Sequence, residues 1–199
     1  MHKYKYMKTI TVGFALAIFL SACNKTPVKP TDDYPEMTYL NFSDSAVVFD
    51  RSASFDLDEN GEKDIRFSTL LVGDPLSQQD KRQWLAVCSF NTSLPVNNNE
   101  NIPVLDLNDL IPINDFSGYR WYNATGIVLS QKVLSMSAPP YWEGAWKDAS
   151  HRFIPIQLRK NNLLYNGWVE ISFDKLQEKI ILHKSAMSEE ADKSVLAGR

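Results

Sequence analysis

Residues 152–183 read RFIPIQLRKNNLLYNGWVEISFDKLQEKIILH and decide the fold. Three short runs rich in β-branched and aromatic residues follow one another here, at 153–158, 167–173 and 179–183. The pair Asn161-Asn162 separates the first two runs, and asparagine is favoured in tight turns. Runs of this length and composition, bounded by turn residues, predict antiparallel strands.

Similar runs precede this stretch, at 46–49, 65–72, 84–90 and 126–129. Turn formers again separate them, and few long helical periods accompany them, so the pattern predicts an antiparallel sandwich or barrel. We expect a mainly β fold: one antiparallel β-sandwich, jelly-roll-like and with long loops, over residues 34–199. Pro155 cannot donate a backbone hydrogen bond, which predicts an edge strand or a bulge at its run.

The N-terminus has the features of a targeting segment. Basic residues (Lys3, Lys5 and Lys8) precede an uncharged apolar run, Ile10 to Leu20, and small residues follow at Ser21-Ala22. This order is typical of a signal peptide. The apolar run is too short for a permanent membrane-spanning helix, which needs about 20 residues.

Leu20-Ser21-Ala22-Cys23 resembles the lipobox of bacterial lipoproteins. The resemblance implies that residues 1–22 are cleaved and that Cys23 is lipidated, so that acyl chains anchor the protein in a membrane. Residue 24 is Asn rather than Asp, which by the same resemblance implies the outer membrane of a Gram-negative envelope, on a face that the motif does not specify. Residues 23–33 are polar and Pro-containing, and they predict a flexible tether.

The charge and cysteine counts exclude several classes of partner. The chain has 21 basic and 24 acidic side chains, and three of the lysines leave with the signal peptide. The mature chain therefore has no basic stripe for nucleic acid, and anionic lipid cannot hold it electrostatically. With Cys23 lipidated, Cys88 has no partner for an intrachain disulfide and is expected to be a small buried hydrophobe.

The most specific chemical pattern is Asp56-Leu-Asp-Glu-Asn-Gly-Glu-Lys-Asp64. Oxygen-bearing side chains at alternate positions can converge on one hard cation if the backbone curls, and Gly61 permits the bend. An EF-hand would need Glu at the twelfth place, where this chain has Phe67. The pattern instead resembles the calcium hairpin loops of integrin-type propellers. We expect a structural Ca²⁺ site with ligands from Asp56, Asp58, Asn60, Glu62 and Asp64. The alternative is a polar hairpin turn without an ion, since Asp, Asn and Gly also favour turns.

Together with the C-terminal third, this loop resembles a poorly characterised β-domain of secreted and surface-anchored bacterial proteins. That domain opens with an FDLDxDGxxDF-like strand–loop–strand and later carries a Tyr-Gly-Trp segment and an Ala-Gly end. The matching stretches here are 55–67, 152–158, 165–171 and 179–198, although Asn166 separates Tyr165 from Gly167. The resemblance implies a β-sandwich and a cell-envelope location, and it implies no activity.

Aromatic residues are concentrated in the second half, in segments 119–122 and 139–146 that look like loops. Five of them, Trp121, Tyr122, Tyr141, Trp142 and Trp146, are candidates for a glycan-binding platform. The alternatives are that they anchor the core and loops, or that they present an apolar patch to an envelope protein partner.

Catalysis has little support in the sequence. Glu143, Asp148 and His151 lie close together, and Asp148 with His151 could form a dyad, yet no nucleophile elbow, zinc motif or phosphate loop accompanies them. We therefore expect a non-catalytic, calcium-stabilised, lipid-anchored envelope domain. A glycan-binding module is the alternative, and a hydrolase is the less favoured third.

Overall fold

The computed structural model describes residues 34–123 and 126–199, and Tyr34–Arg199 belongs to one compact unit. The predicted signal peptide, Cys23 and the tether lie outside the described residues. The described residues form strands and no helices, so none of their elements is a membrane-spanning helix. The strands are β1 (Met37–Val48), β2 (Ala53–Phe55), β3 (Ile65–Asp74), β4 (Gln79–Cys88), β5 (Thr92–Val96), β6 (Leu110–Ile111), β7 (Arg120–Tyr122), β8 (Ile127–Ser135), β9 (Tyr141–Glu143), β10 (Arg152–Lys160), β11 (Leu163–Asp174), β12 (Lys179–Ser188) and β13 (Val195–Leu196).

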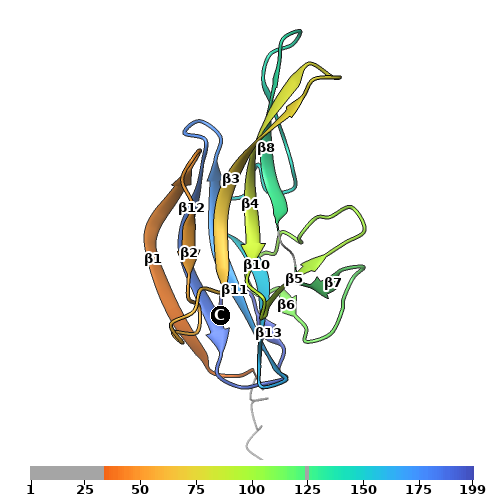
Figure 1. The fold of residues 1–199 in the computed structure, drawn as a ribbon. Coiled ribbons are helices and arrows are strands. Elements are labelled where there is room, and N and C mark those ends of the chain that lie inside the picture. The colour runs from red at the N-terminus through yellow and green to blue at the C-terminus, as the bar shows by residue number, and fades with distance from the viewer. Residues whose placement is uncertain (1–33, 124–125) are drawn as a thin grey trace, which may run out of the picture. The chain divides into compact units, whose positions relative to one another are not determined.

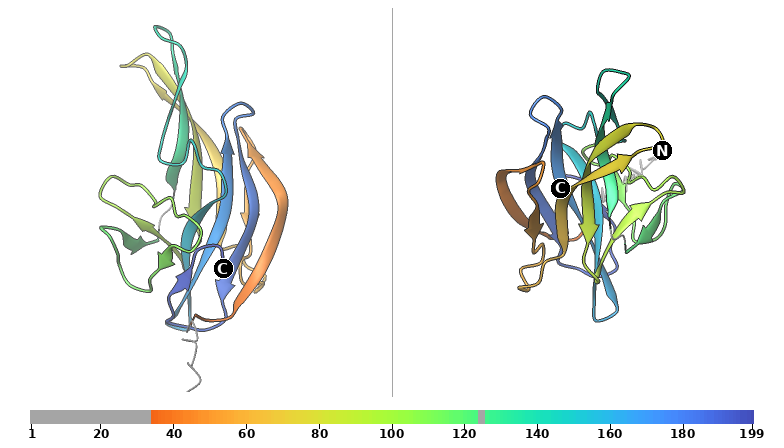
Figure 2. Two further views of the ribbon diagram at one scale, coloured as in Figure 1. Left: turned by 180° about the vertical axis from the view of Figure 1, so that it is seen from behind. Right: turned by 45° about the horizontal axis from the view of Figure 1, so that its top comes forward.

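All of these strands except β6 and β13, which pair with each other, form two antiparallel sheets that pack face to face, which confirms the predicted sandwich (Figure 1; two further views are in Figure 2). One sheet has six strands in the order β1-β12-β11-β10-β5-β7, and the other has five in the order β2-β3-β4-β8-β9. A short turn joins β3 to β4 within the five-stranded sheet. Short turns also join β10 to β11 and β11 to β12 within the six-stranded sheet. Other neighbours, such as β1 with β12 and β4 with β8, are far apart in the chain and are joined by longer connections.

The core lies between the sheets and consists of side chains at alternate positions. On β11 these are Val169, Ile171 and Phe173. The Trp84 ring of the opposing sheet is fully buried, and its centroid lies 5.4 Å from that of Phe173 in an edge-to-face contact. Burial of each such large side chain contributes roughly 1.5–3 kcal/mol to folding. Cys88 is half-buried against this core.

A second, smaller core covers part of the outer face of the six-stranded sheet, which we define as the side turned away from the five-stranded sheet. The β6–β13 pair packs there, with Ile111 and Val195 against Trp168 of β11. The Trp168 Nε1 group donates to the Arg199 carbonyl over 2.9 Å, which fixes the C-terminal residue to the same face.

The β10–β11 hairpin forms where Asn161-Asn162 predicts it. Both residues have positive φ (49° and 64°), as a two-residue type I′ turn requires, and asparagine tolerates this conformation. The turn sets Lys160 opposite Leu163 and thereby fixes the register of the whole hairpin.

Pro155 lies in an interior strand, so the expectation of an edge strand or bulge is wrong. β10 has β11 on one side and β5 on the other. The N–H groups of Phe153 and Arg159 both donate toward the β5 side. Since hydrogen-bonding direction alternates along a strand, the Pro155 nitrogen faces that side too. β5 pairs with β10 at Gln157 and Leu158, so the missing N–H falls where β5 does not pair.

Candidate functional site

The acidic loop 56–64 joins β2 to β3, as the sequence predicts (Figure 1). Leu57 is fully buried in the main core and holds the start of the loop against the sandwich. Gly61 has φ 93°, with open space where a Cβ would lie, which lets the backbone curl at low cost. The loop thus has a buried anchor at Leu57 and an exposed turn at Gly61.

Three of the predicted ligands converge. One oxygen from each of Asp56, Asp58 and Asp64 lies within 4.8 Å of the other two, so the three form an acidic group that could hold a metal ion. The Glu62 carboxylate is not part of this acidic group. The Asn60 side-chain oxygen accepts a hydrogen bond from the Glu62 N–H over 2.7 Å, and Glu62 is exposed.

Backbone N–H groups of the loop hold these carboxylates in place. Asp56 accepts from Asn60 over 3.1 Å and from Gly61 over 2.7 Å, while Asp64 accepts from Leu57 over 2.7 Å. The hydrogen bonds are local, so the spacing of residues in the sequence is sufficient to bring the three side chains together.

Lys160 is a member of the site that the sequence did not indicate. Its Nζ lies 2.7 Å from Asp58 Oδ2, and the Asp58 side chain is only 4% exposed. The same ammonium stands 5.0 Å from the centre of the Tyr165 ring. Lys160 ends β10 of the six-stranded sheet, whereas the loop belongs to the five-stranded sheet, so only the packing of the two sheets places this cation beside the acidic group.

The electrostatics of the group are unbalanced in favour of a further cation. The pKa of Asp64 is raised to about 6, mainly by burial and also by the neighbouring Asp58 and Asp56 carboxylates, against the opposing effects of the Leu57 N–H and Lys160. Burial also acts to raise the pKa of Asp56, but hydrogen bonds from Gly61 and Asn60 outweigh it and lower that pKa. Three carboxylates with one lysine therefore make a site that a hard cation with oxygen ligands would stabilise.

The five candidate aromatic residues do not share one surface. Trp146 is buried, Trp142 packs with Trp84 at a centroid distance of 5.3 Å, and Trp121 packs with Phe116 at 6.1 Å. Tyr122 and Tyr141 are exposed, at 66% and 42%. These segments are not entirely loops, because β7 and β9 form within them as edge strands of different sheets.

The Asp148–His151 dyad considered from the sequence does not form. Asp148 pairs with Lys175 and Lys147, and Glu143 accepts from Gln131 over 2.6 Å. His151 Nδ1 instead lies 2.7 Å from Glu170 Oε1.

His151 belongs to a polar group on the outer face of the six-stranded sheet, beyond the area that β6 and β13 cover. Its ring stacks on His183 at a centroid distance of 4.2 Å and an interplanar angle of 18°. His183 contacts Ser172 through Nε2 (2.8 Å) and Asp44 through Nδ1 (2.6 Å). No sequence motif links these residues, which come from three strands and one loop.

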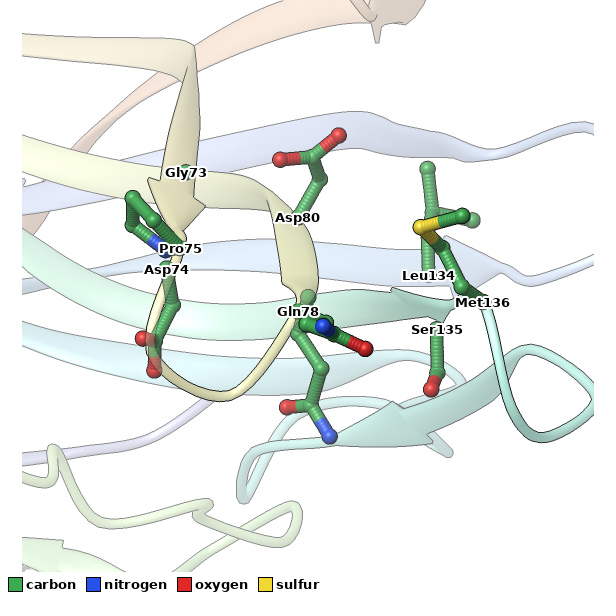
Figure 3. Close-up of a pocket in the computed structure, with 9 residues that line it drawn as sticks. Gly73, Asp74, Pro75, Gln78, Asp80, Leu134, Ser135 and Met136 are labelled. Carbon is green, nitrogen blue, oxygen red and sulfur yellow. The ribbon is translucent and has the colours of Figure 1, made fainter.

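A pocket lies at the turn between β3 and β4, beside the C-terminal end of β8 (Figure 3). Asp74, Asp80, Leu134 and Met136 are among its lining residues. Asp64 directly precedes β3, and Asp74 is its last residue. At about 3.3 Å per residue, the length of this strand separates the pocket from the acidic loop by roughly 30 Å. The pocket is thus a separate feature from the loop.

Comparison of the chain with protein-family models, with curated proteins and with solved structures gave no match. The functional argument therefore rests on the residues and their geometry.

Proposed function

We propose that this protein is a lipid-anchored component of the bacterial outer membrane whose β-sandwich is stabilised by Ca²⁺ in the 56–64 loop. The anchor is supported by the lipobox at Cys23. The calcium site is supported by one observation above all: Asp56, Asp58 and Asp64 offer oxygens within 4.8 Å of one another, in a loop where the Leu57 and Gly61 N–H groups hold two of the carboxylates.

Calcium suits the group better than a softer metal. The three side chains are carboxylates, and loop carbonyls and water can supply the remaining oxygens of a six- to eight-coordinate shell. A bound ion would neutralise the repulsion that raises the pKa of Asp64. Its role would be structural, because it would tie β2 and β3 together at the edge of the five-stranded sheet.

Thermal unfolding of the soluble fragment 24–199, with 1 mM CaCl₂ or with a chelator, tests the site. A dissociation constant near 0.1 mM, at the tight end for extracellular modules, would stabilise the fold by about 1.4 kcal/mol and raise Tm by about 3–5 °C. Asp56→Asn should abolish most of this shift, since it removes a ligand charge and keeps an oxygen for the Gly61 N–H.

Asp80→Asn is the matched control, because Asp80 is an exposed carboxylate near the opposite end of β3, and its calcium shift should equal that of the wild type. A Tm that chelator and calcium leave unchanged in the wild type would refute the calcium site.

Glycan binding is the second candidate function, and the exposure of Tyr122 and Tyr141 favours it. Flat exposed aromatic rings can stack on sugar rings, and either tyrosine could serve alone even though the five aromatics do not form one platform. A glycan array probed with fragment 24–199, with and without calcium, separates this candidate from the presentation of the same residues to an envelope protein.

A further inference from the structure

The hydrogen bonds at His183 have only one consistent direction. The Asp44 carboxylate can only accept a hydrogen bond, so His183 Nδ1 must carry the proton. Nε2 is then an acceptor, and the Ser172 hydroxyl must donate to it across 2.8 Å. Ser172 Oγ in turn accepts from the His151 backbone N–H over 2.9 Å. The network therefore directs the Ser172 proton at Nε2 of His183, an imidazole whose Nδ1 is held by the Asp44 carboxylate.

We propose that Ser172, His183 and Asp44 form a nucleophile–base–carboxylate triad that hydrolyses small carboxylic esters. Such triads are recognised by geometry and roles and occur on unrelated folds. The proposal goes beyond the envelope function above and replaces the expectation of a non-catalytic domain. It is independent of the calcium loop.

A β-bulge in β12 builds this site. The register between β11 and β12 shifts from Glu170↔Lys184 to Ile171↔Leu182, which leaves His183 as the extra residue. Accordingly, the core-facing residues of β12 have even numbers before the bulge, as Leu182 does, and odd numbers after it, as Met187 does. His183 and Lys184 therefore both face outward. A bulge that re-aims a side chain is common next to active sites.

β1 breaks its register at the same place. Its pairing with β12 passes from Asn41 to Ser45, and the intervening Ser43 and Asp44 have φ of 53° and 55°. The left-handed turn pushes Asp44 out of the ladder and toward His183. Two adjacent strands thus depart from regular pairing at one point, and the residues released there are the base and its carboxylate.

The proposed reaction follows the protons. Ser172 Oγ bonds to the ester carbonyl carbon as its proton passes to His183 Nε2. The tetrahedral intermediate then expels the alcohol, which takes that proton. Water next attacks the acyl-serine and gives a proton to Nε2, and the second intermediate releases the carboxylic acid as the proton returns to Ser172. Asp44 keeps the imidazole oriented and stabilises its charged form throughout.

His151 has two parts with different roles. Its backbone N–H, which donates to Ser172 Oγ, is in reach of the oxyanion that forms on the carbon bonded to that oxygen. Its side chain lies over His183 and is held by Glu170, but it is 64% exposed, so it can swing aside at little cost in packing. A substrate displaces this ring.

The exposure of the site indicates its substrate class. The Asp44 side chain is 72% exposed and the triad stands on a strand face, so an acyl group reaches Ser172 from outside the sheet. We therefore assign small O-acyl esters, presented from solvent or from a larger molecule. A single backbone N–H for the oxyanion predicts slow turnover, because each such donor is worth about 10²–10³ in rate.

Two probes of fragment 24–199 test the triad: labelling by a fluorophosphonate, located by peptide mass spectrometry, and hydrolysis of p-nitrophenyl acetate. The label should map to Ser172. Ser172→Ala should remove both signals, whereas Ser68→Ala, which changes a half-buried serine on the other sheet, should leave both unchanged.

A variant of the carboxylate that holds His183 distinguishes a working triad from a merely reactive serine. Asp44→Asn should lower the labelling rate at least about ten-fold through the wrong imidazole tautomer, while asparagine tolerates the positive φ and keeps the fold. Labelling confined to other residues, or equal labelling of Ser172 in Asp44→Asn, would overturn the triad, and the calcium shift in Tm would be unaffected either way.

Discussion

Asp64 shows how one residue can act against the fold and in favour of a ligand. Its carboxylate is almost fully buried, with a pKa of about 6, because burial and two neighbouring carboxylates oppose its charge. At neutral pH the residue is charged in that setting, and its hydrogen bond from the Leu57 N–H offsets only part of the cost. The same unfavourable charge is what would make the loop attract a cation.

A pH-dependent stability should follow in the presence of a chelator. The folded pKa of Asp64 lies above its ordinary value of 3.8, so the folded state holds the proton more tightly. Its stabilising contribution is therefore full below about pH 3.8 and is lost as pH rises through 6, by at most about 3 kcal/mol. Unfolding in a chelator from pH 4.5 to 7.5 measures this.

The control for this prediction is Asp64→Asn, which keeps an oxygen for Leu57 and has no charge to titrate. Relative to this variant, the wild type should lose stability between pH 5 and 7. Adding calcium at pH 7 should restore the wild type alone. Parallel stability curves for the two proteins would show that Asp64 titrates normally.

At the scale of the element, the β11–β12 pair leaves no room for a side chain at Gly167. A Cβ there would lie 2.3 Å from the Ala186 carbonyl oxygen and 2.3 Å from Met187 Sδ. One of these contacts is with backbone, so the strands themselves would have to move. This is the physical reason for glycine before Trp168 in the segment that resembles a Tyr-Gly-Trp motif.

Gly167→Ala should therefore destabilise the sandwich by about 2 kcal/mol, or about 4–8 °C in Tm, within the range for overpacking. Gly126→Ala is the control, because its Cβ would meet only Leu85 Cδ2, at 3.6 Å. Chemical denaturation of both variants measures the difference. Equal stability of the two would mean that β11 and β12 separate without cost.

Bulges and turns show which features of an element sequence can predict. Asn161-Asn162 predicts its hairpin because the conformation of the turn depends on these two residues themselves. The bulge at His183 has no local signal: its only trace is the change from even to odd buried positions along β12, which becomes meaningful once the partner strands are known. The expectation for Pro155 is wrong for a similar reason. The cost of its missing N–H depends on whether a paired strand lies opposite the nitrogen.

On the scale of the whole molecule, residues 34–199 hold their own two cores, and the predicted anchor is a separate addition. Cys23→Ser should therefore move the protein from the membrane fraction to the soluble fraction and abolish palmitate labelling. The Tm of the domain should stay the same, because residues 34–199 supply two cores of their own. Cys88→Ser, which changes the half-buried cysteine beside the main core, should retain the label. Palmitate on the Cys23→Ser protein would refute the lipobox assignment.

The sequence by itself determined the seven longer strands, the sandwich and the acidic loop, because each depends on residues close together in the chain. Asp56, Asp58 and Asp64 meet through hydrogen bonds within nine residues, so spacing alone predicted their convergence. The sequence also supplied the anchor hypothesis at Cys23, which lies outside the described residues.

Only the tertiary structure decided which side chains share a surface. It brought Lys160 to the acidic loop from the opposite sheet, and it dispersed five aromatic residues that are close in sequence. It also assembled Asp44, Ser172 and His183 from three neighbouring strands through two coincident register shifts. The physical reason is that strand pairing and sheet packing join residues far apart in the chain, and a one-residue change of register reverses the face to which a side chain points.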